Sequence, residues 1–388
     1  MNVLQVVPNT VYPATRGGES RANGLIQGFL AAGDEVKRVV QGGLAANHDL
    51  PSIERRIQTP SGCQIFRPVN PVHDVPSLFP VIFNQPTPLL GPLLRLWPPR
   101  PLREGLTWAD LVLVEGPLQV PAICALATET PIVYSSHNVE SDRWGFVTES
   151  NILYNRLVTI ERSAIEECDA LVCTSRRDIR RFDELFGVES PTIVARNGAP
   201  VAAFKQPPES DVKRLRGRIL PAESSRLAVF VGSDYEPNVE AVDRLLATSV
   251  PNGLHLVIVG SVGQHINSPP EWVTKTGFVD NLYTYLAATD VALNPITSGG
   301  GSNVKLAEYL AQGLPVVSTE FGTRGYDLEN NETVLLAEPR ETLNMAATPT
   351  NSELEQLGEQ SRTYAQKHLR WEIISEQLRD EFVKLFTL

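Results

Sequence analysis

The sequence is poor in cysteine and has no long apolar run. Four of its 388 residues are cysteine, and their spacing shows no CxxC pair of the kind that holds zinc. Buried thiols in a reducing compartment are the simpler interpretation, so we expect a cytoplasmic protein. No window offers about 18 consecutive apolar residues, which excludes an ordinary membrane-spanning helix. The first residues also lack the charged start and apolar core of a secretory signal.

An excess of positive charge is missing as well. The formal net charge is −11, so the chain has no overall basic field to attract a polyanion. We therefore expect no nucleic-acid partner. A hydrophobic content of 42% is instead that of a globular protein with a sizeable core, and 388 residues are enough for two domains.

Short apolar runs rich in β-branched residues alternate with helical patterns along the whole chain. One helical pattern lies at 20–32, where Leu25, Phe29 and Ala32 recur at helical spacing. The strand candidates are 3–7, 35–40, 110–115, 131–136, 170–175, 192–196, 227–232, 255–260, 290–295, 314–319 and 333–337. This alternation predicts parallel sheets covered by helices on both faces.

The alternation is interrupted once, near the middle of the chain. Three prolines break the pattern, polar residues follow, and strand-like runs resume at Leu227. We therefore predict a first domain over 1–196, a linker over 197–222 and a second domain over 223–366. If both domains are doubly wound, the carboxyl ends of their strands would line a shared cleft.

Residues 75–102 do not fit this scheme. They carry eight prolines among leucines, phenylalanines and a tryptophan, too many for a continuous helix. One interpretation is an ordered loop with short helices packed on the first domain. The other is an apolar surface that touches a membrane or a lipid-linked partner.

The stretch TSGGGSNVKLAEYLAQGLPVVST places a glycine-rich loop before a helix. Ser302 is a suitable N-cap and Gly313 a suitable C-terminal glycine, which predicts a helix over 303–312. Glycines ahead of a helix N-terminus can form an anion site, to which Lys305 would add a cation. The alternative from spacing alone is a surface ion pair between Lys305 and Glu308.

This stretch resembles the nucleotide-binding motif of glycosyltransferase family 4, in which a glycine-rich loop precedes K-x-x-E and A-x-G-x-P-V-V-S/T. Seven further stretches resemble other parts of the family, in the same order: TRGGESR, YSSHNVES, IERSAIEECDALVCTS, VARNGAPVAAF, FVGSDYEPNVEAVDRLL, TGFVDNLYTYLAATDVALNP and HLRWEIISEQLRDEF. The resemblance implies the GT-B fold, an α/β architecture of two facing Rossmann-like, doubly wound parallel-sheet domains. It also implies that a C-terminal helix over 367–388 packs back on the first domain.

The resemblance implies roles for particular residues. As catalytic residues it implies Lys305, which would neutralise the diphosphate leaving group, and His137, which would lie beside the transferred sugar. Glu308 would hold the ribose hydroxyls, and the backbone at Phe278 and Val279 would contact the base. The other donor-binding residues that it implies are Gly17, Gly18, Gly232, Asp234, Asn238, Gly299, Gly300, Gly301, Ser302 and Asn303.

The implied activity is the transfer of a sugar, with retention, from a UDP- or GDP-sugar to a hydroxyl-bearing sugar or lipid-linked acceptor. Polysaccharide, glycolipid and lipid-linked glycan are the product classes. No Asp-x-Asp motif occurs, so we expect no metal bridge to the diphosphate and no other cofactor. A peripheral contact with the inner face of a membrane would involve 75–102.

Three positions depart from the family pattern. Gly300 stands where many members carry glutamate, Asn303 stands where many carry arginine, and Ser233–Tyr235 replace an arginine–lysine pair. These departures leave open what supports the charge of the donor, with Asp234 and Asn238 as candidates. Three alternatives on this fold remain: a nucleotide-sugar epimerase, a sugar phosphorylase, and a catalytically silent subunit that binds nucleotide sugars.

Overall fold

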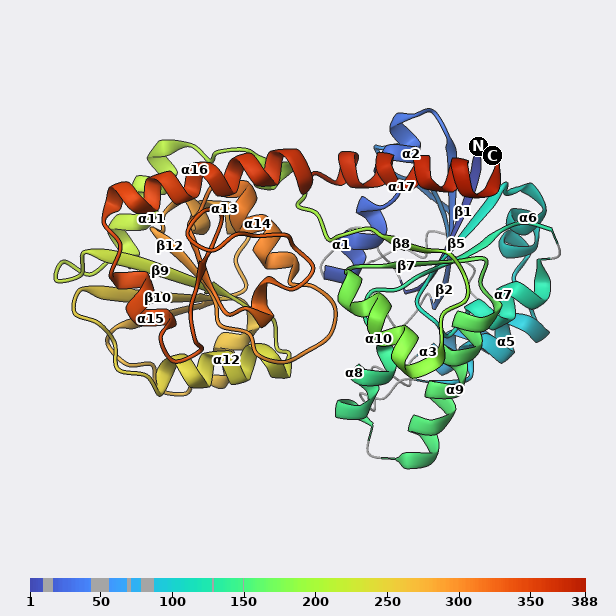
Figure 1. Cartoon of the computed structure of the whole chain (residues 1–388), viewed down its shortest axis with the longest axis horizontal. Helices are drawn as coiled ribbons and strands as arrows, with labels where there is room; N and C mark the ends of the chain where they lie inside the picture. The colour runs from blue at the N-terminus through green and yellow to red at the C-terminus, as the bar shows by residue number, and fades with distance from the viewer. Residues whose placement is uncertain (10–16, 43–55, 68–70, 78–86, 128, 149) are drawn as a thin grey trace. The chain divides into compact units, whose positions relative to one another are not determined.

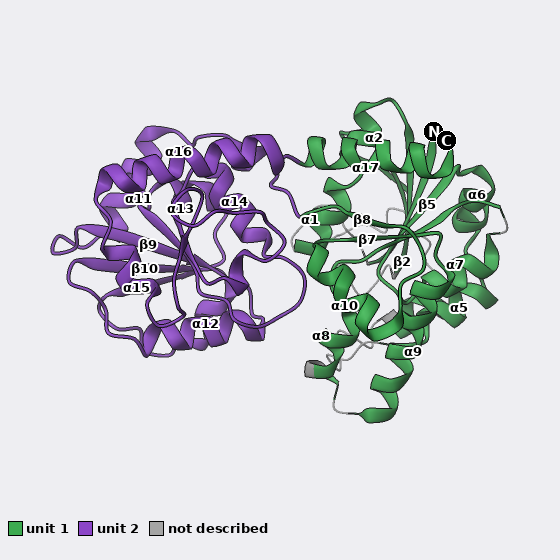
Figure 2. Ribbon diagram, viewed as in Figure 1, with its two compact units in different colours: residues 1–196, 371–388 green, residues 197–370 purple. Residues whose placement is uncertain are grey.

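The computed structural model describes residues 1–9, 17–42, 56–67, 71–77, 87–127, 129–148 and 150–388. The chain forms two compact units, which are traced in Figure 1 and coloured separately in Figure 2. Unit 1 comprises 1–196 and 371–388, and unit 2 comprises 197–370. Each unit is a largely parallel sheet with helices packed on it. The predicted α/β architecture of two Rossmann-like domains is therefore confirmed.

Unit 1 is built on an eight-stranded sheet of order β3-β4-β2-β1-β5-β6-β7-β8, parallel except for β3 against β4. Its strands are β1 (Asn2–Asn9), β2 (Glu35–Gly42), β3 (Arg56–Gln58), β4 (Gln64–Phe66), β5 (Leu111–Glu115), β6 (Ile132–Ser135), β7 (Ala170–Cys173) and β8 (Thr192–Val194). Its helices are α1 (Gly17–Gly24), α2 (Gln27–Ala31), α3 (Pro71–Ser77), α5 (Leu90–Leu96), α6 (Arg100–Trp108), α7 (Val120–Leu126), α8 (Glu140–Val147), α9 (Asn151–Glu167), α10 (Arg176–Phe186) and α17 (Trp371–Phe386). The six strand candidates of the first half all lie in this sheet, whereas β3 and β4 are absent from the prediction.

Alternate residues of β1 face opposite sides of this sheet. Leu4 and Val6 pack with side chains of α5, α6, α7, α9 and α10. Val3 and Val7 pack with side chains of α1, α2 and α17. Because helices cover both faces, the central strands read as continuous apolar runs rather than as alternating ones.

The helix predicted over 20–32 is split into α1 and α2. At the break, the Ser375 hydroxyl of α17 accepts from the Gly28 N–H at 2.8 Å and donates to the Leu25 carbonyl at 2.5 Å. A Cβ on Gly28 would lie 2.3 Å from the α17 backbone, so the glycine permits this close approach. The C-terminal helix thus packs against α2 of the first domain, as predicted.

Unit 2 is built on six parallel strands of order β11-β10-β9-β12-β13-β14. The strands are β9 (Arg226–Val231), β10 (Leu254–Val259), β11 (Val273–Gly277), β12 (Val291–Asn294), β13 (Val316–Ser318) and β14 (Leu335–Leu336). The helices are α11 (Glu209–Ile219), α12 (Glu236–Leu246), α13 (Leu282–Ala287), α14 (Val304–Gln312), α15 (Thr342–Ala347) and α16 (Asn351–His368), with 3-10 turns η1 (Val201–Phe204), η2 (Ser261–His265) and η3 (Phe321–Thr323). One face of the sheet packs mainly on α13, α14 and α16, and the other on α12 and α15. The strand candidates of the second half all lie in this sheet, and β11 is the strand that the prediction lacks.

The residues predicted as a linker are folded. Residues 197–222 contain η1 and α11 and belong to unit 2. Pro208 lies at the N-cap of α11, where a missing N–H is not needed, so the proline starts this helix instead of breaking it. Arg216 then ties α11 to the sheet by donating to the Asp290 carboxylate at 2.9 Å.

The proline-rich segment forms short helices where the structure describes it; 78–86 lie outside the described residues. Leu94 and Leu102 are buried in the core of unit 1. Leu96 and Trp97 are 66% and 54% exposed. The segment therefore packs on the first domain through one set of side chains and presents apolar side chains at the surface through another.

Candidate functional site

The glycine-rich loop of unit 2 runs from the end of β12 to the start of α14. Gly299 and Gly301 have φ values of 104° and 60°, a left-handed region that favours glycine. A Cβ on Gly299 would lie 3.0 Å from the Pro237 ring. The loop therefore needs glycine both for its backbone conformation and for its close approach to the first turn of α12.

The start of α14 differs by one residue from the prediction. Asn303, rather than Ser302, is the N-cap, and the helix begins at Val304. The Ser302 hydroxyl accepts instead from the Asn197 side-chain amide at 2.9 Å. The Asn303 amide donates to the Gly322 carbonyl at 3.0 Å. These two polar side chains therefore hold the loop to its neighbours within unit 2.

The end of α14 agrees with the prediction. Gly313 has a left-handed φ of 73°, and the Leu314 N–H donates back to the Tyr309 carbonyl at 3.0 Å. This is a common way for a helix to end at a glycine. The Tyr309 hydroxyl also accepts from the Val231 N–H at 2.8 Å, which fixes α14 against the end of β9.

Lys305 lies in the first turn of α14 and is partly buried. Its ammonium donates to the Asn238 side-chain oxygen at 2.7 Å and lies 4.2 Å from the centre of the Phe230 ring. Burial, with a smaller contribution from the nearby Arg324 guanidinium, lowers the pKa of Lys305 from its usual 10.5 to about 7. The immediate hydrogen-bond partner is neutral, so the site favours an anion next to Lys305.

Glu308 lies one turn further along α14. Its carboxylate accepts from the Tyr283 hydroxyl at 3.2 Å, and burial raises the pKa of Glu308 to about 7 although that hydrogen bond opposes the shift. Lys305 and Glu308 therefore bond to different elements, α12 and α13. The structure therefore does not contain the surface ion pair between Lys305 and Glu308 that their spacing allowed.

The loop after β9 and the first turn of α12 carry three of the predicted residues. Gly232 lies close to the end of β10, since a Cβ on Gly260 would lie 2.3 Å from the Gly232 carbonyl oxygen. Asn238 reaches Lys305, as described above. Asp234 points elsewhere and pairs with His265 at 2.6 Å at the surface. Of the two candidates for supporting donor charge, the structure brings only Asn238 into contact with Lys305.

Phe278 and Val279 follow β11 directly. Gly277 turns the chain there with φ 70°, and the Asn281 side chain caps α13 by accepting from the Thr284 N–H at 3.3 Å. Phe278 is 85% exposed, whereas Val279 packs against the core of unit 2. The two residues therefore form a short exposed turn at the carboxyl end of a strand.

Arg324 is a candidate residue that the sequence-based prediction lacks. It follows η3, and its guanidinium donates to the Gly300 carbonyl and to the Phe321 carbonyl, each at 3.0 Å. It also stacks at 4.0 Å over the Phe321 ring. The signal in the sequence is a basic residue shortly after the strand candidate 314–319, at the sheet edge that carries the glycine-rich loop.

In unit 1, His137 lies beyond the carboxyl end of β6. Its Nε2 lies 2.7 Å from the Glu115 carboxylate at the end of β5. Burial alone would raise the pKa of Glu115, but its interaction with His137, with smaller contributions from Arg21 and Gln5, holds that pKa below its usual value. Glu115 is also absent from the prediction, although its place at the end of a strand candidate could have marked it.

Gly17 and Gly18 open α1 in the same unit. A Cβ on Gly18 would lie 2.9 Å from His137 Nδ1. The structure thus brings together Gly18 and His137, which the sequence assigned separately to the donor. The side chains of Glu115 and His137 meet at the carboxyl ends of the adjacent strands β5 and β6, close to the Gly18 backbone, and open α/β sheets bind ligands at this edge.

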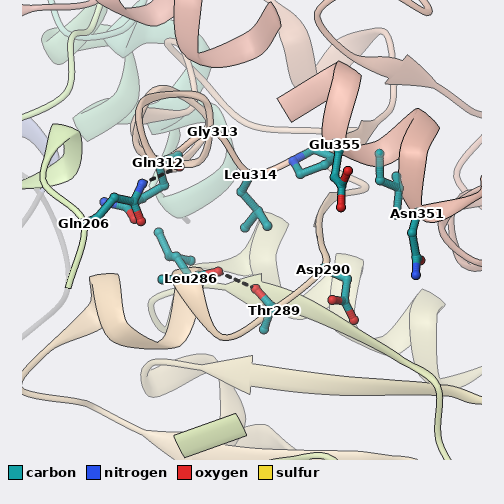
Figure 3. Close-up of a pocket in the computed structure, with 12 residues that line it drawn as sticks. Gln206, Leu286, Thr289, Asp290, Gln312, Gly313, Leu314, Asn351 and Glu355 are labelled. Atoms are coloured by element: carbon teal, nitrogen blue, oxygen red, sulfur yellow. Dashed lines mark hydrogen bonds between the residues drawn. The ribbon is translucent and has the colours of Figure 1, made fainter. Parts of the chain in front are cut away.

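A cavity of about 330 Å³ lies elsewhere in unit 2. Figure 3 shows its lining, which includes Asp290, Gln312, Gly313 and Glu355. Its residues precede β12 and β13, so it opens at the amino edge of the sheet, one helix length from Lys305. At about 1.5 Å per residue, α14 separates the two by roughly 12 Å. The cavity is not part of the candidate site.

The cysteines and the helices add two observations. The four cysteines are free thiols, and three of them are buried. Among the helices that the structure describes, none combines the length and apolar character needed to cross a bilayer.

Solved structures of similar fold match the chain over nearly its full length. Sucrose-phosphate synthase from Thermosynechococcus elongatus has a TM-score of 0.76 at 17% identity, with 100% of each chain covered. HepE from Anabaena, in complex with UDP-glucose, has a TM-score of 0.69 at 16% identity, covering 98% of this chain and 99% of that one. An E. coli trehalose-6-phosphate structure bound with UDP-2-fluoro glucose has a TM-score of 0.63 at 14% identity, covering 100% and 99%.

Two family models match the sequence itself. Residues 15–202 match the one described as Glycosyltransferase Family 4, and 225–349 match the one described as Glycosyl transferases group 1. No curated protein matches the sequence at a significant level. The matches fall on both units, and the fold is that of the GT-B neighbours. The chain therefore belongs to glycosyltransferase family 4 and has the GT-B fold.

Proposed function

We propose that this glycosyltransferase transfers a sugar from a UDP-sugar, with GDP-sugars as the alternative donors, to a hydroxyl acceptor. The observation that carries the proposal is Lys305, a partly buried ammonium at the start of α14 with a neutral hydrogen-bond partner and a second cation nearby. A diphosphate would supply the anion that this arrangement favours. The similar structures in complex with UDP-glucose and with UDP-2-fluoro glucose support UDP over GDP.

Lys305 would act on the leaving group. As the bond to the sugar breaks, negative charge grows on the diphosphate, so an ammonium contact strengthens in the transition state. The α14 N-terminus and Arg324 would add positive potential. In other enzymes, a divalent metal bound by an Asp-x-Asp motif neutralises the diphosphate. We propose that Lys305, Arg324 and the α14 N-terminus do so here without a metal.

The remaining predicted residues would each contact a different part of the donor. Glu308 would accept hydrogen bonds from the ribose hydroxyls, and the exposed turn at Phe278 and Val279 would contact the base. Gly17 and Gly18 of unit 1 would let the backbone approach the diphosphate, and His137 would lie beside the transferred sugar. Retention of anomeric configuration is part of the proposal, because the family resemblance implies it.

The acceptor is proposed to be a hydroxyl on a sugar or on a lipid-linked molecule. The surface near α5 and α6 combines exposed Leu96 and Trp97 with three exposed arginines, Arg95, Arg100 and Arg103. In a chain of net charge −11, this local combination of apolar and basic side chains supports a peripheral contact with an anionic membrane.

A donor panel tests the proposal. Wild type, Lys305→Ala and the control Lys213→Ala would be incubated with UDP- and GDP-sugars, with and without a cell lipid extract. Lys213 is a matched control because it lies in the same unit and is 74% exposed. The readouts are the melting temperature and the release of nucleoside diphosphate.

We expect one UDP-sugar to raise the melting temperature of wild type and of Lys213→Ala, and lipid extract to accelerate release. Lys305→Ala should lose at least about 100-fold in kcat/KM, the size of effect seen when one charge-stabilising group is removed. If no nucleotide sugar stabilises wild type, the proposed donor site is wrong. Donor binding without turnover under any condition would instead support the catalytically silent subunit.

A further inference from the structure

His137 ends a continuous chain of buried hydrogen bonds in unit 1. Arg38 Nε donates to Gln5 Oε1 at 2.8 Å, and Gln5 Nε2 donates to Glu115 Oε1 at 2.6 Å. Glu115 Oε2 lies 2.7 Å from His137 Nε2. Arg38, Gln5 and Glu115 are each at most 2% exposed. A buried polar chain of this kind is stable only when each donor meets an acceptor, so its directions can be worked out.

The directions are set from the arginine end. A guanidinium only donates, so the oxygen of the Gln5 amide must face Arg38. The Gln5 NH₂ then has two acceptors, the Glu115 carboxylate and the Ala22 carbonyl at 2.9 Å. An ionised Glu115 only accepts, so His137 Nε2 must carry the proton of their hydrogen bond.

The other ring nitrogen of His137 faces Gly18. A Cβ at that position would lie 2.9 Å from Nδ1 and 3.4 Å from Cε1. Because glycine has no Cβ, the Gly18 backbone can lie close to Nδ1 without a clash. In a neutral imidazole that is protonated on Nε2, Nδ1 has a free lone pair and can accept a hydrogen bond.

We propose that Glu115 is a positioning residue that holds His137 in the Nε2–H tautomer, so that Nδ1 accepts a hydrogen bond from a hydroxyl of the transferred sugar. This inference rests on the proposed function, because it assigns the sugar hydroxyl to the donor. It adds a residue, an atom and a direction of hydrogen bonding. Orientation of a histidine by a buried carboxylate is a common device for presenting its second nitrogen.

Other charged groups around this pair come from two further elements. Arg21 of α1 contributes charge to Glu115 and donates to the Ala195 carbonyl at 2.7 Å. Arg38 lies on β2 and interacts with both Glu115 and the Cys63 thiol. Both arginines favour an ionised Glu115, which keeps that carboxylate an acceptor toward His137.

The substitution Glu115→Gln should reverse the tautomer. The oxygen of the new amide must face the Gln5 NH₂, because Arg38 fixes the Gln5 orientation. The new NH₂ then faces His137 and donates to Nε2, which transfers the imidazole proton to Nδ1. A change of one atom type, with nearly the same shape, would thus turn Nδ1 from an acceptor into a donor.

The test combines NMR with kinetics on the full chain. Imidazole ¹⁵N chemical shifts distinguish protonated from unprotonated ring nitrogens, and His137→Ala assigns the His137 signals. Wild type, Glu115→Gln, His137→Ala and the double variant are compared in turnover of the UDP-sugar. The control is Glu104→Gln, which removes a carboxylate that is 62% exposed in the same unit.

We expect protonated Nε2 in wild type and protonated Nδ1 in Glu115→Gln. The variant should lose about 10- to 100-fold in kcat, with KM within about threefold, and Glu104→Gln should match wild type. In the His137→Ala background, Glu115→Gln should have no further effect, because it acts through the imidazole.

Two results would overturn the proposal. One is a protonated Nε2 that persists in Glu115→Gln. The other is an equal loss of kcat in the presence and absence of the imidazole, which indicates a general structural role. If wild type turns over no nucleotide sugar, the proposed function fails, and the NMR measurement still decides whether Glu115 sets the tautomer.

Discussion

The two units treat their buried ionisable groups in opposite ways. In unit 1, the carboxylate of Glu115 faces His137 at 2.7 Å, and the hydrogen-bond chain behind it is complete within the unit. In unit 2, Lys305 donates to a neutral amide, and burial together with a second cation, Arg324, lowers its pKa. Unit 1 supplies a carboxylate partner for His137, whereas unit 2 leaves Lys305 without a negative partner of its own.

This difference indicates which interactions exist before the donor arrives. A histidine with a fixed carboxylate partner is oriented in the free protein, so its contribution depends on position. A lysine amine with a lowered pKa is protonated more fully when an anion binds next to it, so its contribution depends on the ligand. Variants of unit 1 should therefore change turnover more than binding, whereas variants of unit 2 should also weaken binding of the diphosphate.

Among the variants that distinguish the roles of the two units, we expect Gly18→Ala to cause the largest loss of activity. The new methyl group would lie 2.9 Å from His137 Nδ1, so the imidazole must move. We expect a loss of about 100-fold in kcat, the cost of misplacing a catalytic group by about 1 Å. Affinity for UDP, measured by calorimetry, should stay within about twofold.

Gly145→Ala is the matched control for this variant. It makes the same change in a helix of unit 1, where the new Cβ would lie 3.8 Å from the Tyr154 ring, at ordinary contact distance. Both alanines raise helix propensity by about 1 kcal/mol, so neither should unfold its helix. Equal losses of kcat in the two variants would contradict a specific effect on His137.

A smaller effect is expected in unit 2 from Arg324→Gln. Glutamine can still donate to the Gly300 carbonyl and hold the loop, but the positive charge is lost. One hydrogen bond to a charged group is worth about 1.5 kcal/mol, which corresponds to roughly tenfold weaker binding of UDP. Uridine, which lacks the diphosphate, should bind as it does to wild type.

The control for the lost charge is Arg340→Gln, since Arg340 is an exposed arginine of the same unit. It should leave the affinity for UDP unchanged. If Arg324→Gln weakens uridine and UDP equally, Arg324 only shapes the loop, and the assignment of positive charge to the diphosphate would have to be dropped.

The smallest effect is a change in protonation when the donor binds. With a pKa of about 7, Lys305 is about 10% protonated at pH 8. A bound diphosphate raises that pKa, so binding should take up a proton, and affinity should fall as the pH rises above about 7. Calorimetry of UDP-glucose at pH 8, in two buffers of different ionisation enthalpy, measures the uptake, and UDP-glucose itself does not titrate there.

Glu308 is the other group that could take up this proton, because its pKa is also about 7. The variant Glu308→Gln removes that contribution. We expect proton uptake to persist in Glu308→Gln and to disappear in Lys305→Met. The reverse pattern would show that Glu308, and not Lys305, takes up the proton when the donor binds.

The elements were more predictable than their contacts. Each predicted strand is present, and Gly313 ends α14, because apolar runs and left-handed glycines act over a few residues. The helix over 20–32 is split because Ser375 enters its ladder, and that residue lies more than 340 positions away in the chain. Such an interaction has no local signal.

The candidate site shows the same division. Glycines 299–301 and Lys305 are recognisable because a glycine-rich loop, a helix start and a cation are close in sequence. Glu115 and Arg324 were not predicted, because each contacts a residue of another element. Glu115 contacts His137, which is 22 positions away, and Arg324 contacts Gly300, which is 24 positions away. The predicted roles of the site residues toward the donor stay predictions.

The sequence by itself determined the α/β class, the positions of most strands and helices, the glycine-rich loop and the family. Periodicity, turn residues and motif spacing carry these features, since they depend on residues near one another in the chain. Only the tertiary structure decided that Lys305 meets Asn238, that Glu308 meets Tyr283 and that Glu115 holds His137. The order of strands in each sheet sets these pairs, and that order follows from packing whole elements against one another.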